Sequence, residues 1–148
     1  MVTGIIGESC TGKSSIAGEL SKRRNAIVFT GKDYMKLAKS EADARKLFIN
    51  LLRSNESGDD DIIFVITETD HISFLPSGAL RILVTADLDI IKERFTKRMN
   101  GTLPAPVAAM LESKHGMFDG EMNDLHIHNV GESISDICDR IEALLAKG

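Results

Sequence analysis

The stretch from Gly7 to Ser14 combines two glycines, a lysine and a serine at fixed spacing, Gly-x-x-x-x-Gly-Lys-Ser. Glycine lets the backbone turn tightly and brings its N–H groups close to a ligand. Successive N–H groups that point into one concavity bind anions, and the start of a following helix adds its positive dipole end. The spacing matches the phosphate-binding loop in full, so the sequence predicts that this segment binds the phosphates of a nucleotide.

Two side chains of this loop are expected to act directly on the phosphates. Lys13 would contact the β- and γ-phosphates, and the hydroxyl of Ser14 would supply an oxygen ligand to Mg²⁺. Backbone N–H groups along the loop and the first helical turn would provide the other contacts. The residues predicted to bind nucleotide in this segment are Gly7, Glu8, Ser9, Cys10, Thr11, Gly12, Lys13, Ser14 and Ser15.

The segments around this loop alternate between apolar strands and amphipathic helices. Strands are expected at 3–7, 26–30, 62–67, 80–85 and 124–130. Helices are expected at 13–24, 88–98, about 106–118 and after Ser133, with two more between 33 and 54 that meet near Ser40. Because parallel strands need crossover helices, this order predicts one three-layer α/β/α domain over residues 1–148. Its five strands are expected to form one parallel sheet.

Ligands of such sheets bind beyond the carboxyl ends of the strands. The segments that follow the first three strands here are Gly7–Ser14, Thr30–Asp33 and Thr67–Asp70. Glu68 ends the most continuously apolar strand, and a carboxylate at that place can hold the hydration shell of Mg²⁺. The sequence therefore predicts Ser14 and Glu68 as the metal-binding residues.

Two arginines lie four residues apart near the end of the helix at 88–98. Arg94 and Arg98 share one helix face and lead into a loop with glycine and proline at 99–106. Two guanidinium groups can neutralise the charge on a phosphoryl group, and a loop of this composition can close over a site. The alternative is ordinary surface charge, with Arg98 placed favourably at a helix C-terminus.

With these motifs in place, the chain resembles the nucleoside monophosphate kinases of the adenylate and cytidylate kinase type, and more loosely the shikimate-kinase-like enzymes. The segment FTGKDYMK (29–36) resembles the start of the acceptor-binding helices of that family. Residues 81–98 resemble its fourth strand and the helix that ends in E-R-x-x-x-R. Residues 124–145 resemble its last strand, an asparagine-containing loop and its closing helix. The resemblance implies a P-loop NTPase fold, with the strand order 2-3-1-4-5 in its sheet and a short lid at 99–106.

The resemblance also implies roles for particular residues. Arg94 and Arg98 would be lid-side arginines that meet the transferred phosphoryl group. Asp33 would lie on the acceptor side, where it accepts the proton of a hydroxyl or orients a sugar or the metal; its alternative is a helix cap. The backbone at Asn129 and Gly131 would border the nucleotide base, and the alternative is an ordinary turn. Lys13, Asp33, Arg94 and Arg98 form the predicted catalytic set, and ATP and Mg²⁺ are the predicted cofactors.

One segment departs from the pattern of nucleotide kinases. After the third strand many of them have Asp-Gly followed by Pro-Arg, whereas this chain has ITETDH, without the glycine or the arginine. Arg45 and Arg53, on the acceptor-side helices, are substitutes for the missing arginine, and their alternative is solvated helix charge. The acceptor segment at 33–56 is also short, which favours a compact acceptor.

The function predicted from these features is phosphoryl transfer from ATP to a small acceptor, with a cytidylate-like nucleoside monophosphate as the leading choice. A small hydroxyl metabolite is an alternative acceptor. A non-catalytic P-loop protein that binds nucleotide and regulates a partner is the alternative from another class. A GTPase is disfavoured because the guanine-reading N-K-x-D stretch is absent from the expected position.

The overall composition narrows the remaining classes. The net charge is −4 and no long basic run occurs, which argues against a nucleic-acid partner. Cys10 and Cys138 form no CxxC pair, which is typical of a reduced cytoplasmic protein without a cysteine metal site. No apolar run is long enough for a bilayer and no signal peptide is evident, so we expect no membrane partner. We expect a monomer or homodimer.

Overall fold

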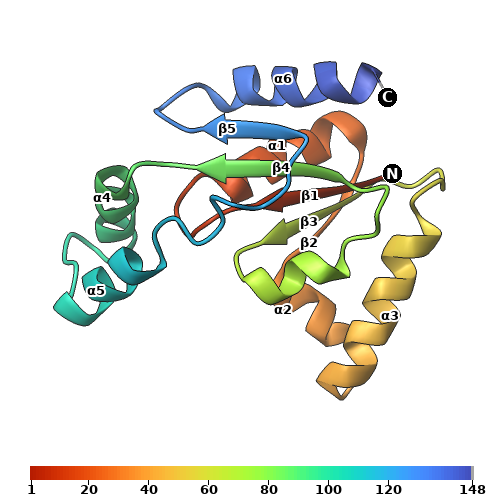
Figure 1. Ribbon diagram of the computed structural model, residues 1–148, viewed down its shortest axis with the longest axis horizontal. Helices are drawn as coiled ribbons and strands as arrows, with labels where there is room; N and C mark the ends of the chain where they lie inside the picture. The colour runs from red at the N-terminus through yellow and green to blue at the C-terminus, as the bar shows by residue number, and fades with distance from the viewer. Residues whose placement is uncertain (148) are drawn as a thin grey trace.

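The computed structural model describes residues 1–147 and contains a five-stranded parallel sheet between helices (Figure 1). The strands are β1 (Val2–Ile6), β2 (Ile27–Phe29), β3 (Ile62–Ile66), β4 (Leu80–Thr85) and β5 (Leu125–His128). The helices are α1 (Lys13–Arg24), α2 (Gly31–Tyr34), α3 (Glu41–Ser54), α4 (Leu88–Arg98), α5 (Ala105–Lys114) and α6 (Ile134–Lys147), and the 3₁₀ turns are η1 (Met35–Leu37) and η2 (Thr69–Phe74). The strand order is β2-β3-β1-β4-β5, which confirms the predicted topology.

The two central strands are buried along their whole length. Every residue of β1 and β3 is buried, as expected for strands that helices cover on both faces. The registers pair Ile6 with Ile66 of β3 and with Leu83 of β4. Three neighbouring strands therefore end near one another, and the loops that follow them share one edge of the sheet.

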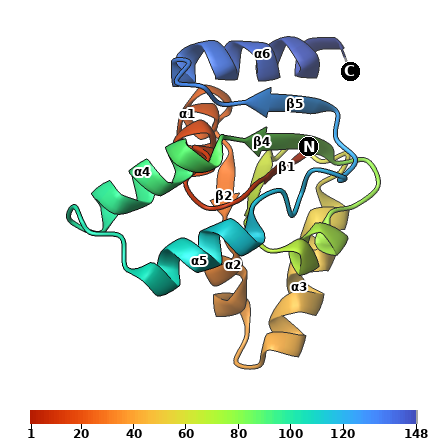
Figure 2. The ribbon, with the colours of Figure 1, turned by 60° about the vertical axis from the view of Figure 1, so that its left-hand side comes forward.

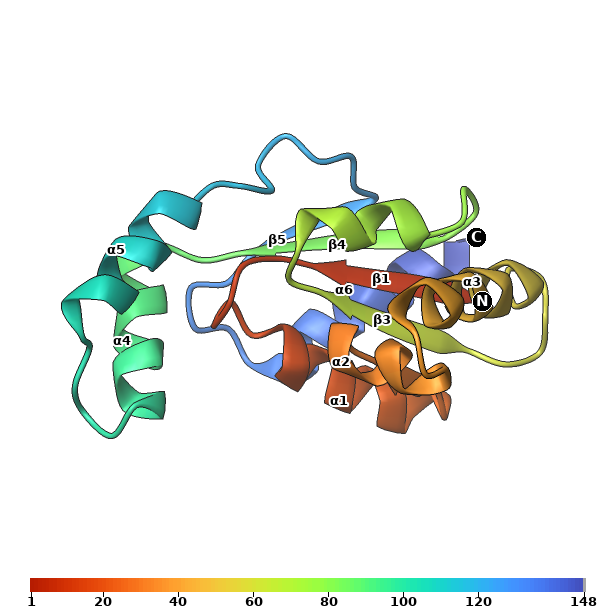
Figure 3. The same cartoon turned by 90° about the horizontal axis from the view of Figure 1, so that it is seen from below.

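Each face of the sheet has its own apolar core. One core joins strand residues to Phe48 of α3 and Phe74 of η2, with Tyr34 of α2 packed beside them. The other joins the opposite strand faces to α1 and α6 through residues such as Ile16 and Ile141. Seen from below, α1 and α6 lie on one side of the sheet and η2 lies on the other (Figure 3). These cores fix the strand ends that carry the loops.

Helices α4 and α5 project beyond the edge at which the strands end (Figures 1 and 2). They form a small third cluster with the loop after β1, in which Cys10 packs with Ala86, Ile91 and Leu111. The loop after β1, which the sequence predicts to bind phosphate, is thus supported from the side by the helix pair that carries Arg94.

Most expected elements are present with shifted ends. The type of residue at Asp87 favours a helix cap. Asp87 occupies the N-cap position of α4, but its side chain makes no capping bond and instead pairs with His128 at 3.2 Å. The fifth helix ends at Lys114 rather than near 118, because His115 is extended and Gly116 has a φ of 83°. Ser40 does cap α3, where its hydroxyl accepts the N–H of Asp43.

Candidate active site

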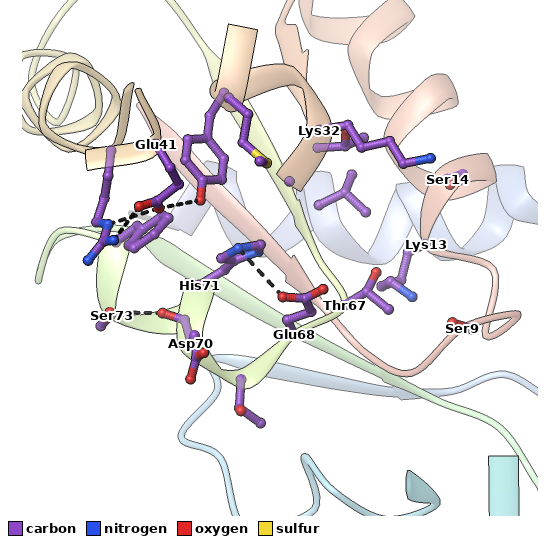
Figure 4. A pocket seen from close by; sticks show the side chains of 18 of the residues that line it. Ser9, Lys13, Ser14, Lys32, Glu41, Thr67, Glu68, Asp70, His71 and Ser73 are labelled. Atoms are coloured by element: carbon purple, nitrogen blue, oxygen red, sulfur yellow. Dashed lines mark hydrogen bonds and ion pairs between the residues drawn. The ribbon is translucent and has the colours of Figure 1, made fainter. Parts of the chain in front are cut away.

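Two adjoining cavities lie at the carboxyl edge of the sheet. The larger, about 1130 Å³, extends from the loop after β1 toward α2, α3 and η2, and Figure 4 shows its lining. The smaller, about 430 Å³, lies between the same loop, α4 and the segment after β5. The residues common to both linings are Cys10, Lys13, Ser14 and Arg98. The start of α1 therefore stands where the two cavities meet.

The loop from Gly7 to Gly12 follows β1 and closes onto the N-terminus of α1, as its glycines predict. A Cβ on Gly7 would lie 2.3 Å from the carbonyl oxygen of Val84, so only glycine fits there. Gly12 has a φ of 104° and Cys10 a φ of 63°, which places both in the left-handed region. These two residues turn the chain so that it enters α1 directly.

Side chains from distant elements hold this loop by its carbonyl oxygens. Arg94 of α4 donates to the carbonyl of Cys10 at 3.0 Å, and buried Asn129 after β5 donates to the carbonyl of Thr11 at 2.9 Å. The hydroxyl of Thr11 donates to the carbonyl of Glu8 at 2.9 Å. Because the carbonyl oxygens of Cys10, Thr11 and Glu8 accept these hydrogen bonds, the loop conformation is fixed by side chains as well as by its glycines.

Lys13 is buried beneath the loop, with only 5% of its surface exposed. Its ammonium group donates to the carbonyl oxygen of Glu8. Burial lowers the pKa of Lys13 to about 8, and the nearby Arg98 guanidinium acts in the same direction while the Glu8 carboxylate opposes it. A desolvated cation at the junction of the two cavities is well placed to gain from an anionic ligand.

The side chain of Glu8 has a different place from the one expected of a nucleotide-binding residue. It is 8% exposed and accepts the N–H of Gly116 at 3.1 Å, while His115 lies 3.1 Å from its other oxygen. Only the backbone of Glu8 therefore remains for phosphate, and its carboxylate ties the end of α5 to the loop. Nothing in the spacing of the loop signals this contact.

The other residues predicted on the nucleotide side lie in the expected region. Ser9 lines the larger cavity, Ser15 and Gly131 line the smaller one, and Arg98 lines both. The guanidinium of Arg98 lies over the ring of Phe95 at 5.7 Å. The structure thus brings together the loop, both arginines and the segment after β5, which come from three separate parts of the chain.

Asp33 stands apart from this group. Its carboxylate accepts the N–H of Thr30 at 2.9 Å and the hydroxyl of Thr30 at 3.0 Å, which completes a capping box at α2. These two hydrogen bonds, the backbone one first, hold the pKa of the Asp33 carboxyl below its usual value. Asp33 does not line the larger cavity, although Thr30 and Gly31 do. A catalytic role for Asp33 stays a prediction, and the cap is what this placement supports.

The wall of the larger cavity facing the loop combines Arg45 with Tyr34 and Glu41, which the sequence did not single out. Buried Tyr34 donates from its hydroxyl to Glu41 at 3.1 Å, and Glu41 also pairs with Arg45. Arg45 lines this cavity, whereas Arg53 is exposed and is not part of the lining. Of the two substitutes considered for an acceptor-binding arginine, only Arg45 is in place, and it is already paired.

The segment after β3 brings Thr67, Glu68, Asp70 and His71 to the same wall. The side chain of Glu68 is 71% exposed, and its carboxylate lies 3.8 Å from Nε2 of His71. In Figure 4 this carboxylate lies between His71 and Lys13. A polar cluster directly after a buried strand was the signal available in the sequence, and it pointed to Glu68 alone.

The oxygen donors of the larger cavity suit Mg²⁺, which needs few protein ligands, better than a metal ion that only protein side chains coordinate. Within residues 1–147 no group of three or more His, Cys, Asp or Glu side chains could hold a metal ion. Mg²⁺ keeps several waters and uses one or two protein oxygens together with phosphates. The hydroxyl of Ser14 and the carboxylate of Glu68 line one cavity and offer such oxygens. Together they fit the role predicted for them, which stays a prediction.

The predicted lid at 99–106 corresponds to the connection between α4 and α5 and the first turn of α5. Asn100 and Gly101 have φ values of 62° and 92°, which form the turn. An ion pair between Lys92 and Glu112 ties the two helices together. Closure of this segment over the site stays a prediction.

Among residues 1–147, none of the helices combines the length and the apolar composition that a membrane-spanning helix requires.

Comparison with known proteins gives a structural result only. No protein-family model matches the chain, and no curated protein sequence is detectably similar to it. Among solved structures, a shikimate kinase from Acinetobacter baumannii in complex with shikimate superposes with a TM-score of 0.69 at 12% identity, over 99% of this chain and 93% of that one. The chain has the P-loop kinase fold.

Two further solved structures share the architecture over nearly the whole chain. An uncharacterized protein from Eubacterium ventriosum has a TM-score of 0.72 at 15% identity, over 100% of this chain and 99% of that one. A gluconokinase from Sinorhizobium meliloti 1021 has a TM-score of 0.64 at 13% identity, over 98% and 91% of the two chains. The shared architecture therefore spans the whole chain, and the choice of acceptor has to be argued from the site.

Proposed function

We propose that the protein transfers the γ-phosphoryl group of ATP, bound with Mg²⁺, to a small acceptor. The observation that carries this proposal is the junction of two cavities at Lys13 and Ser14, at the end of a loop with full phosphate-binding spacing. The smaller cavity suits the nucleotide and the larger one suits the acceptor. A protein that only binds nucleotide has no need of the second cavity.

In this reaction the protein would position ATP and the acceptor and neutralise the charge of the phosphates. Backbone N–H groups of the loop and the Lys13 ammonium would hold the phosphates, and Ser14 and Glu68 would hold Mg²⁺, whose charge offsets that of the phosphates. Arg98 lines both cavities and Arg94 lines the smaller, so both can reach phosphate oxygens from the α4 side. Asn129 and Gly131 would border the base.

The resemblance favours a nucleoside monophosphate acceptor, and the charges of the larger cavity favour a hydroxyl compound. Lys13 and Arg98 line this cavity at its junction with the smaller one, where they face the proposed nucleotide. From α2, α3 and the segment after β3 the cavity receives two further cations, Lys32 and Arg45, and three carboxylates, Glu41, Glu68 and Asp70. Arg45 is already paired with Glu41. A phosphate acceptor brings about two negative charges and needs unpaired cations. We therefore place a small hydroxyl metabolite first and a nucleoside monophosphate second.

A coupled assay for ADP tests the proposal with a panel of polyols, sugar acids, hydroxy acids and nucleoside monophosphates. Acceptor-dependent ADP release that is lost in Lys13→Met is the expected result. If no acceptor stimulated ADP release while calorimetry still showed binding of Mg-ADP, phosphoryl transfer would be wrong. Nucleotide-dependent regulation of a partner would then be favoured.

A further inference from the structure

His71 is an ionisable side chain at the acceptor end of the site that the roles described above leave unused. It belongs to η2, and its side chain is only 13% exposed. Three aromatic rings surround the imidazole: Tyr34 edge-on with centroids 5.4 Å apart, Phe74 at 5.2 Å and Phe64 at 5.9 Å. Aromatic contacts on several sides leave the ring little freedom to turn. Its orientation is therefore set by the core.

The end of β2 is shaped to accept this ring. A Cβ on Gly31 would lie 2.8 Å from Cε1 and 3.3 Å from Nδ1 of His71. The φ of Gly31 is outside the left-handed region, so the backbone conformation does not require glycine there. Glycine is required by the close approach of the imidazole. Gly31 and His71 thus form one fitted contact between the segments that follow β2 and β3.

The polar edge of the ring faces the cavity. Within residues 1–147 the ring nitrogens make no hydrogen bond to protein, and Nε2 lies 3.8 Å from a carboxylate oxygen of Glu68. That separation is too long for a direct hydrogen bond but short enough for one oxygen atom to bridge. No buried side-chain nitrogen or oxygen among the described residues lacks a hydrogen-bond partner, so the ring nitrogens of His71 reach the open cavity and can take a partner from it. A ligand hydroxyl placed between Nε2 and Glu68 would supply one.

We propose that His71, positioned by Gly31, binds the hydroxyl group of the acceptor and selects a hydroxyl compound over a phosphate compound. The imidazole lies beside Gly31, in the part of the acceptor wall that follows β2. Asp33 belongs to the same segment, but its carboxylate caps α2. Glu68, on the other side of the bridging position, disfavours an anionic acceptor group. This inference rests on the proposed phosphoryl transfer and assigns its acceptor-binding residue.

The competing interpretation is that His71 only fills the aromatic core. His71→Phe separates the two, because it keeps an aromatic ring and removes both nitrogens. We expect the KM for the best hydroxyl acceptor of the panel to rise about tenfold or more, since one hydrogen bond in a desolvated site is lost. The KM for Mg-ATP is expected to stay unchanged. His71→Gln, which restores an N–H donor, is expected to recover part of the loss.

Gly31→Ala tests the same contact from the other side. The added methyl group displaces the imidazole without removing any polar atom, so we expect a similar rise in acceptor KM and unchanged binding of Mg-ADP. In the double variant Gly31→Ala/His71→Phe the second change should add little, because both act through one contact. Gly18→Ala is the matched control, since nothing lies within 4 Å of the added methyl group.

The outcomes distinguish this inference from the function on which it rests. An acceptor KM that stays at the wild-type value in both His71→Phe and Gly31→Ala would overturn the role of His71 and leave phosphoryl transfer standing. A nucleoside monophosphate as the best acceptor would also overturn the inference alone. Wild-type protein that turned over no acceptor would overturn the proposed function, and the inference with it.

Discussion

The two halves of the site are built in different ways. On the side proposed for the nucleotide, one contiguous loop would supply the binding groups, and its shape is fixed by glycines and by Arg94 and Asn129, which hold its carbonyls. On the side proposed for the acceptor, α2, α3 and the segment after β3 each supply a few side chains that meet only in the fold. A binding loop that depends on backbone geometry requires particular residues at fixed spacing, which form a recognisable sequence motif. A cavity wall made of side chains from several elements has no such fixed spacing. The comparison explains why the first half was predictable and the second was not.

The strongest test of the nucleotide half is Lys13→Met. This change removes the cation at the junction of the cavities and keeps an unbranched side chain only one atom shorter, so we expect kcat to fall about 10²–10³-fold. The melting temperature should not fall, because a buried charge is replaced by an apolar group. Steady-state kinetics and thermal unfolding of the same preparations measure both effects. A kcat equal to that of the wild type in this variant would contradict the phosphate-binding role of the loop.

The close packing of the loop predicts a large loss of stability for Gly7→Ala. The new Cβ would stand 2.3 Å from the backbone carbonyl of Val84, which cannot move without disturbing β4. We expect the free energy of unfolding to fall by about 2–4 kcal/mol. Gly18→Ala, on the open face of α1, should instead raise it by about 0.5–1 kcal/mol. Denaturant unfolding measures both, and equal values for the two would contradict the fit of Gly7.

The lowered pKa of Lys13 predicts that nucleotide affinity depends on pH. The protonated amine pairs with phosphate, and the free protein loses this proton above pH 8. Affinity for Mg-ATP should therefore fall about tenfold per pH unit above pH 8, with proton uptake on binding. Calorimetry in buffers of different ionisation enthalpy detects that uptake, which should vanish in Lys13→Met.

The lowered pKa of Lys13 also predicts how the stability of the nucleotide-free protein depends on pH. Stability is expected to rise with pH, whereas nucleotide affinity falls. The unfolded chain keeps the Lys13 proton up to its ordinary pKa of 10.5, whereas the folded protein loses it near 8. Because the unfolded state binds more protons in this interval, the Lys13 contribution to the free energy of unfolding rises between pH 8 and 10.5. A Lys13→Met variant should show a smaller rise.

The smallest expected effect belongs to the acceptor half, at Asp33. Asp33→Asn weakens the capping box at α2, so we expect a stability loss of about 0.5–1 kcal/mol and a kcat within a few fold of the wild type. Glu68→Gln, at the cavity wall, should lower kcat much more. If Asp33→Asn abolished turnover of a hydroxyl acceptor without loss of stability, the carboxylate would have to leave its cap during the reaction.

The sequence was informative wherever one residue type satisfied a local requirement. The parallel sheet followed from the alternation of elements, its strand order followed from the resemblance, and the positions of Lys13 and Ser14 followed from the loop spacing. The end of α5 was predicted too late because the positive φ of Gly116, and the bond from its N–H to Glu8, depend on a loop more than one hundred residues away. Such long-range contacts leave no periodic pattern.

The acceptor wall shows the same limit more clearly. Asp33 was predicted to face the acceptor because it follows β2, but Thr30 offers its N–H and hydroxyl to that carboxylate first. His71 attracted no attention in the sequence, since its meaning depends on Gly31 and on three aromatic rings from separate elements. A lone glycine and a lone histidine forty residues apart cannot be paired without the fold.

The most direct test of the account is ³¹P NMR of ATP, Mg²⁺ and the best hydroxyl acceptor with wild-type protein and with Lys13→Met. The account predicts that the wild type forms a new phosphomonoester signal in a one-to-one ratio with ADP, and that the variant forms almost none. Formation of ADP and free phosphate without any phosphomonoester, or equal product with both proteins, would contradict phosphoryl transfer at this loop.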